Sequence, residues 1–73
     1  MKNVAPENLI KDRLSETLKH VGVSYRSIAK QLNVSPSLIS QYASGKKLPR
    51  LETFVRLCTV LDVAPEYILG FAD

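Results

Sequence analysis

Cysteine and histidine are nearly missing from this 73-residue sequence, which contains one of each. A single cysteine excludes an internal disulfide, and one cysteine with one histidine cannot complete the tetrahedral shell of a structural zinc site. The sequence also has no glycine-rich phosphate loop and no pairing of a nucleophile with a base. We therefore expect no catalytic residue, no metal and no cofactor, and an enzyme is the function that the sequence favours least.

Long apolar runs are absent as well. None approaches the roughly 20 residues that a membrane-spanning helix needs. The first residues lack the basic-then-apolar pattern of a signal peptide, and a lone cysteine suits a reducing cytosol. We therefore expect a soluble, cytoplasmic protein without a membrane partner.

Glycine and proline are few, with three and four residues, whereas hydrophobic residues make up 45% of the chain. This composition is not that of a disordered or low-complexity segment, and 73 residues suffice for one domain. We expect this domain at residues 6–73, after a flexible N-terminus at residues 1–5. Folding at this size buries only about 60% of the unfolded surface, so stability is marginal.

Acidic residues are missing from the middle of the chain, between Thr17 and Leu51. The basic residues within this window are Lys19, Arg26, Lys30, Lys46, Lys47 and Arg50. With a net charge of +3, a basic middle between mixed-charge ends is what a phosphate-facing surface needs. Charge alone is equally compatible with a solvated basic face that has no function.

Start and stop signals predict an all-α chain of five helices and no strand. The expected helices lie at about 6–21, 25–32, 36–44, 51–61 and 67–69. Ser24 and Ser35 are the expected N-caps of the second and third helices, and Pro36 suits the first turn of the third. Gly22 and Asn33 are expected to end the first and second helices in a left-handed conformation. Gly45 is expected to end the third helix, and the fifth is expected before Gly70.

The fourth predicted helix has one apolar stripe at helical spacing. This stripe consists of Leu51, Phe54, Val55, Cys58 and Leu61, with Leu57 beside it. Because Cys58 lies on the stripe, we interpret it as a core residue.

The most informative part of the sequence is the pair of short helices at 25–32 and 36–44, joined by a tight turn. A short turn forces the two helices to cross steeply, so that the second can project from the domain. Ala29 is small where the helices must approach closely. The apolar contacts that fix the crossing are expected from Ile28, Leu32, Val34, Ile39 and Tyr42. A helix-turn-helix requires this arrangement.

The outward face of the segment at 36–44 has no charged residue. Together with the cap it consists of small or uncharged residues: Ser35, Pro36, Ser37, Ser40, Gln41 and Ser44. Solvated helices are usually rich in Glu, Lys and Arg, whereas small polar side chains let a helix lie deep in a major groove, where Gln pairs with adenine and Ser with several bases. The alternative is a serine-rich surface without function, and we favour DNA reading.

Ordered motifs extend through Leu14–Leu69. They are Val23-Ser24, Ile28-Ala29-Lys30-Gln31-Leu32-Asn33-Val34-Ser35, Leu38-Ile39-Ser40-Gln41-Tyr42, Gly45-Lys46-Lys47-Leu48-Pro49, Leu51-Glu52-Thr53 and Val60-Leu61-Asp62-Val63. In this order they resemble the phage-repressor and Cro-like helix-turn-helix family, also called the xenobiotic-response-element family. The resemblance implies a compact five-helix, lambda-repressor-like fold, operator DNA as the ligand and a two-fold dimer.

The resemblance also implies roles for aligned residues. The positions that face base edges are Pro36, Ser37 and Gln41, with Ser40 beside them. Tyr25, Ser44, Lys46 and Lys47 occupy backbone-contacting positions. Their neighbours Ser24, Arg26, Ser35 and Arg50 complete our predicted phosphate contacts.

Three departures from the family pattern affect these roles. Tyr25 replaces a frequent Gln whose amide braces the recognition helix, and Pro36 replaces another Gln and offers no polar base contact. Specificity then depends more on Ser37, Ser40 and Gln41. Leu18 and Ala43 stand where many members have a buried Arg–Glu pair, a replacement that can be neutral or stabilising.

The function that these features favour is a repressor that occupies a near-palindromic operator in double-stranded DNA as a homodimer. Such a protein belongs to a prokaryotic nucleoid or is phage-encoded. The alternative is an antitoxin-like or adaptor module that binds a protein partner. The apolar C-terminal residues could cap the core or form a dimer surface, and the dimer is slightly favoured: Tyr67, Ile68, Leu69 and Phe71.

Overall fold

The computed structural model describes residues 6–72, and this part of the chain contains five helices and no strand. They are α1 (Pro6–His20), α2 (Tyr25–Leu32), α3 (Pro36–Ser44), α4 (Leu51–Leu61) and α5 (Pro65–Leu69). The predicted all-α class with five helices is therefore confirmed. The flexible N-terminus expected at residues 1–5 lies outside the described residues, as does Asp73.

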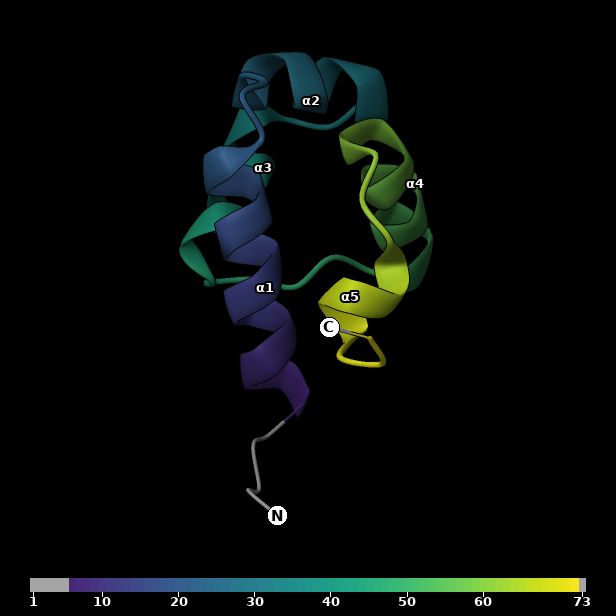
Figure 1. The fold of residues 1–73 in the computed structure, drawn as a ribbon. Coiled ribbons are helices and arrows are strands. Elements are labelled where there is room, and N and C mark those ends of the chain that lie inside the picture. Colours follow the sequence, from purple (N-terminus) through teal and green to yellow (C-terminus); the bar gives the residue numbers. More distant parts are fainter. Residues whose placement is uncertain (1–5, 73) are drawn as a thin grey trace.

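The helices form a small closed bundle (Figure 1). α1 and α3 lie on one side and α4 on the other, while α2 runs across one end and α5 lies at the opposite end. Contacts between α1 and α3, α1 and α5, and α2 and α4 close the bundle around one core. Within the described residues no helix is long and apolar enough to cross a membrane.

The core receives side chains from all five helices. The largest fully buried side chains are Leu14, Leu18, Ile28, Ile39, Leu57 and Ile68. Each aliphatic side chain of this size contributes about 1.5–3 kcal/mol when it leaves water. No polar or charged side chain is buried among residues 6–72, so this stability depends on apolar packing.

Cys58 is buried at 3% exposure, which confirms its interpretation as a core residue. Burial raises the pKa of its thiol. The thiol therefore stays protonated near neutral pH, and a protonated buried thiol is chemically inert.

The expected stripe of α4 was wrong at two positions. Leu51 is 76% exposed and Val55 54% exposed, whereas Leu57, expected only beside the stripe, is fully buried. The buried side of α4 is formed by Phe54, Leu57, Cys58 and Leu61. The cause is that 7 of its 11 residues are apolar, so helical spacing alone fits more than one face and packing decides which face turns inward.

A charged side chain connects the two ends of the chain. The Arg13 guanidinium on α1 donates hydrogen bonds to the carbonyls of Tyr67 at 2.5 Å and Ala72 at 2.8 Å. It also lies 4.6 Å from the centre of the Tyr67 ring, a distance at which a cation is attracted to an aromatic face. Arg13 thereby holds α5 and the residues after it against α1.

Candidate nucleic-acid interface

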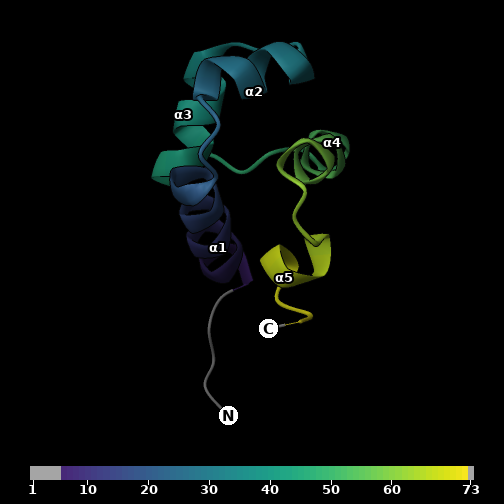
Figure 2. The same cartoon turned by 45° about the horizontal axis from the view of Figure 1, so that its top comes forward.

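The turn between α2 and α3 depends on one residue with left-handed backbone. Asn33 has φ 60° and ψ 45°, a conformation that Asn tolerates better than most residues. Its N–H donates to the carbonyl of Lys30 at 3.2 Å, and the Val34 N–H donates to the carbonyl of Ala29 at 3.0 Å. These bonds satisfy the last carbonyls of α2 and reverse the chain within a few residues. Figure 2 shows the result, with α3 descending steeply from one end of α2.

Both helices of this unit begin at a serine cap. The Ser24 hydroxyl accepts from the Ser27 N–H at 3.1 Å, and the Ser35 hydroxyl accepts from the Leu38 N–H at 3.2 Å. A hydroxyl that accepts at its oxygen still has its own hydrogen to donate. Both serines are exposed, so each can donate outward from a helix start, where the helix dipole and free N–H groups attract anions.

The two faces of α3 differ completely. Ile39, Tyr42 and Ala43 are buried at 0%, 4% and 4% exposure. The residues on the other face are all exposed: Pro36, Ser37, Ser40, Gln41 and Ser44. Within residues 6–72 the side chains of Ser37, Ser40 and Gln41 make no hydrogen bond to the protein. Their polar groups are therefore free for an outside partner.

The segment after α3 carries the exposed cations. Gly45 ends the helix with φ 80°, and the Lys46 N–H donates to the Gln41 carbonyl at 3.0 Å. Lys46, Lys47 and Arg50 are exposed. The ion pair found in the described part of the chain lies elsewhere, between His20 and Glu16 on α1, so none of these three cations forms an ion pair there.

Tyr25 and Arg26, at the start of α2, occupy different environments. The Tyr25 side chain is half-buried against the core, whereas Arg26 is exposed. Half-burial fixes the direction of the Tyr25 ring. This residue therefore offers less freedom to a ligand than the Gln that is frequent in the family.

Sequence reasoning missed the contact that braces α3 from behind. Leu18 and Ala43, which stand where many family members have an ion pair, are both buried. The Ser15 hydroxyl on α1 donates to the Ala43 carbonyl near the end of α3, at 2.5 Å and across 28 residues of sequence. A neutral hydrogen bond and apolar packing thus connect α1 to α3. Ser15 carried no motif that could have revealed this.

The C-terminal apolar residues differ widely in their exposure. Ile68 is fully buried and Phe71 is 85% exposed, while Tyr67 and Leu69 are partly buried against the core. Ile68 therefore caps the core of its own chain and has no surface to offer a second subunit. α5 also lies at the far end of the bundle from α2, as Figure 1 shows.

The steep helix pair, its two caps and its exposed polar face lie in the stretch that comparison with known families identifies. The helix-turn-helix family model matches residues 14–68. The chain belongs to the Cro-like helix-turn-helix family. It is thus a DNA-binding helix-turn-helix domain of a kind typical of transcriptional regulators, and the family is not usually enzymatic. No curated protein and no solved structure is significantly similar to it.

Proposed function

We propose that this protein is a sequence-specific repressor that acts by occupying its operator, with α3 as the recognition helix in the major groove. The observation that carries the proposal is the division of α3 into two faces. Ile39 and Tyr42 fix one face in the core, and the other offers small polar side chains that have no partner within residues 6–72. A major groove about 12 Å wide admits such a helix.

Base reading falls to three residues of the exposed face. Gln41 can pair with adenine through both its amide atoms, whereas the hydroxyls of Ser37 and Ser40 can bond several bases. Pro36 has no side-chain donor or acceptor, so it offers a base edge only apolar contact. Each good bidentate pair discriminates by roughly 1–3 kcal/mol.

Phosphate contacts set the register of the domain on DNA and supply most of its non-specific affinity. We assign them to the exposed or half-exposed polar residues at the helix starts and in the basic loop: Ser24, Tyr25, Arg26, Ser35, Ser44, Lys46, Lys47 and Arg50. The support is their exposure or half-exposure and the absence of acidic residues between Thr17 and Leu51 in the sequence. One domain reads few bases, so useful specificity requires a homodimer on a near-palindrome with half-sites roughly 34 Å apart.

Selection of bound duplexes from a random pool tests the proposal directly. We expect a preferred sequence with two-fold symmetry. Binding should also weaken steeply with salt, because each phosphate contact contributes about 0.9 to the slope of log affinity against log salt. Lys46→Ala with Lys47→Ala should weaken binding to every duplex and lower this slope by about 2.

A matched control removes two lysines from α1, as Lys11→Ala with Lys19→Ala, and should leave more of the slope intact. If the chain binds no duplex at low ionic strength, the proposal is wrong. Salt-insensitive binding to a protein instead would support the antitoxin-like or adaptor alternative.

A further inference from the structure

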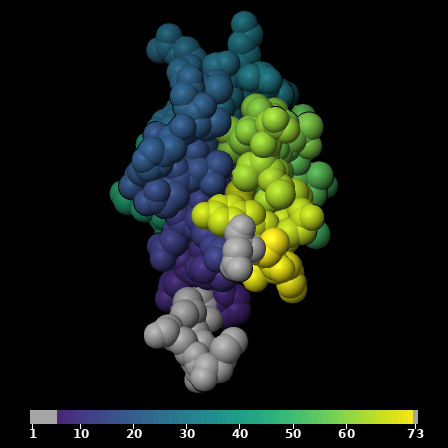
Figure 3. Space-filling view, viewed as in Figure 1, coloured from purple at the N-terminus to yellow at the C-terminus, as the bar shows by residue number. Residues whose placement is uncertain are grey.

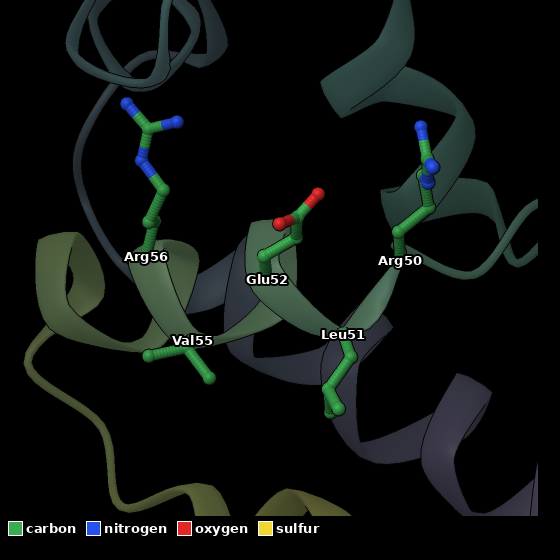
Figure 4. A pocket seen from close by; sticks show the side chains of 5 residues that line it. All are labelled: Arg50, Leu51, Glu52, Val55 and Arg56. Atoms are coloured by element: carbon green, nitrogen blue, oxygen red, sulfur yellow. The ribbon is translucent and has the colours of Figure 1, made fainter.

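The largest exposed aliphatic side chains of α4 have no role in the DNA-binding proposal. Leu51 is 76% exposed and Val55 54% exposed. Together with Arg50, Glu52 and Arg56 they line an open hollow of about 710 Å³. Figure 4 shows two rows along the helix, with the two aliphatic side chains on one side and the three charged side chains on the other.

A second hollow, of about 250 Å³, lies beside Leu51. All of its lining residues are apolar: Ile10, Leu48, Pro49, Leu51, Phe54 and Leu69. Leu51 is thus a projecting aliphatic side chain shared by the walls of both hollows. Contiguous exposed apolar surface of this kind commonly marks a protein interaction site.

We propose that this α4 face, consisting of Leu51, Glu52, Val55 and Arg56, binds the same face of a second copy of the chain across a two-fold axis. The charge and the spacing of the two rows of side chains on this face support such an interface. If a two-fold axis crosses α4 at right angles, the two copies of α4 are antiparallel. Each row of side chains then faces the same row of the other copy. Such an interface must be self-complementary.

Both rows meet this condition. Apart from Arg50, which precedes α4, each row has two residues four positions apart. Leu51 therefore faces Val55 of the second copy, while Glu52 faces Arg56 of the second copy. The midpoints of the two pairs differ by one residue, about 1.5 Å along a helix, so one axis serves both. Glu52 and Arg56 are exposed, and within residues 6–72 they form no ion pair with each other. They are therefore available to a partner.

The position of α4 also suits a dimer on DNA, a point that rests on the proposed function. Half-sites roughly 34 Å apart place each recognition helix roughly 17 Å from the two-fold axis. α3 lies on the opposite side of the bundle from α4 (Figure 1), and the two shorter dimensions of the domain are 22 Å. If the two-fold axis passes along the outer face of α4, the distance from α3 to this axis is therefore comparable to the required distance of roughly 17 Å.

Charge reversal and its rescue test the proposal. Sedimentation equilibrium of the 73-residue chain without DNA, up to millimolar concentration, should show a monomer–dimer equilibrium. Glu52→Arg places like charges opposite each other and should raise the dissociation constant about tenfold, as should Arg56→Glu. The double variant, with both reversals, restores opposite charges and should return to within about threefold of the natural chain. Val55→Ser should weaken the dimer, whereas Phe71→Ser, at an exposed apolar residue outside the α4 face, should not.

Three outcomes would overturn the α4 interface: a natural chain that stays monomeric at every concentration, single reversals that change nothing, or a double variant no better than the singles. Loss of the dimer in Phe71→Ser alone would also overturn it, in favour of the C-terminal surface. Because no DNA is present, the result is separate from the repressor proposal. A chain that dimerises as predicted but binds no duplex would support the α4 interface and contradict the repressor proposal.

Discussion

α3 and α4 each bury one face and expose another, and their exposed faces differ in chemistry. α3 turns its apolar residues inward and leaves serines and a glutamine outside, whereas α4 leaves a leucine and a valine outside beside an acid and an arginine. Small polar groups suit the edges of bases, and aliphatic side chains suit a protein surface. A domain of this size can thus expose one polar surface suited to DNA and one apolar surface suited to a protein, if its helices differ in their apolar content.

The largest effect should come from the hidden side of α3. Ile39→Ala removes a fully buried side chain and should cost about 2–5 kcal/mol of the free energy of unfolding, a large part of the stability of so small a domain. Ser40→Ala, on the exposed side, should change it by less than about 0.5 kcal/mol. Urea unfolding followed by circular dichroism measures both. Equal losses would mean that α3 does not have one buried and one free face.

The exposed side of α3 should control sequence preference. Gln41→Ala should remove roughly 1–3 kcal/mol of discrimination at one base pair and leave non-specific affinity intact. The Gln41 carbonyl still accepts from Ser44 and Lys46, so the helix end is unchanged. Competition binding with single-base-pair variants of the selected site measures the effect, and Gln31→Ala on the exposed side of α2 is the matched control. A uniform loss on all duplexes would refute the base contact.

The starts of the two helices differ as well, and this difference can be reversed. Ser35 caps α3 through its side chain, whereas Arg50 stands at the corresponding position of α4, with similar extended backbone and no side-chain cap. Ser35→Ala should lose about 1 kcal/mol of stability, and Arg50→Ser should gain up to about 1 kcal/mol. Thermal unfolding measures both changes. If Arg50 contacts phosphate, Arg50→Ser should also weaken binding to every duplex, so that stability and affinity change in opposite directions.

Local signals allowed the prediction of α3 but not the orientation of α4. Ser35, Pro36, Asn33 and Gly45 each constrain backbone within a few residues, and these constraints suffice to define the turn and its helix. α4 has no side-chain cap and is apolar at most positions. Its rotation about its own axis is therefore decided by packing against α2 and the shared core, which no local pattern records.

The same reasoning explains which contacts of the site were missed. Ser15 meets the Ala43 carbonyl across 28 residues, and Arg13 meets the Tyr67 carbonyl across 54. In both cases a side chain bonds to backbone, which every residue has. A sequence pattern cannot single out such a partner. Ile68 and Phe71 illustrate a related limit, because both are apolar but only the fold places one in the core and the other in solvent.

The smallest expected effect is on the pH dependence of stability, and it comes from one buried ionisable side chain on each of α3 and α4. Burial raises the pKa of the Tyr42 hydroxyl on α3 above its ordinary 10.0 and that of the Cys58 thiol on α4 above its ordinary 9.0. In the unfolded chain these groups ionise at their ordinary values. Above about pH 10 for Tyr42 and about pH 9 for Cys58, the folded state therefore binds more protons than the unfolded state. The free energy of unfolding contributed by each group is complete below that pH and falls as pH rises through it.

Two variants distinguish the contribution of Cys58 on α4 to this pH dependence from that of Tyr42 on α3. Cys58→Ala should remove the decline that begins near pH 9, and Tyr42→Phe, which keeps the ring, should remove the decline that begins near pH 10. Urea unfolding at intervals between pH 7 and about pH 11 measures both slopes against the natural chain. If neither variant changes the slope, the two groups reach solvent in the folded protein. The inner face of α3 and the inner face of α4 would then be less closely packed than their burial indicates.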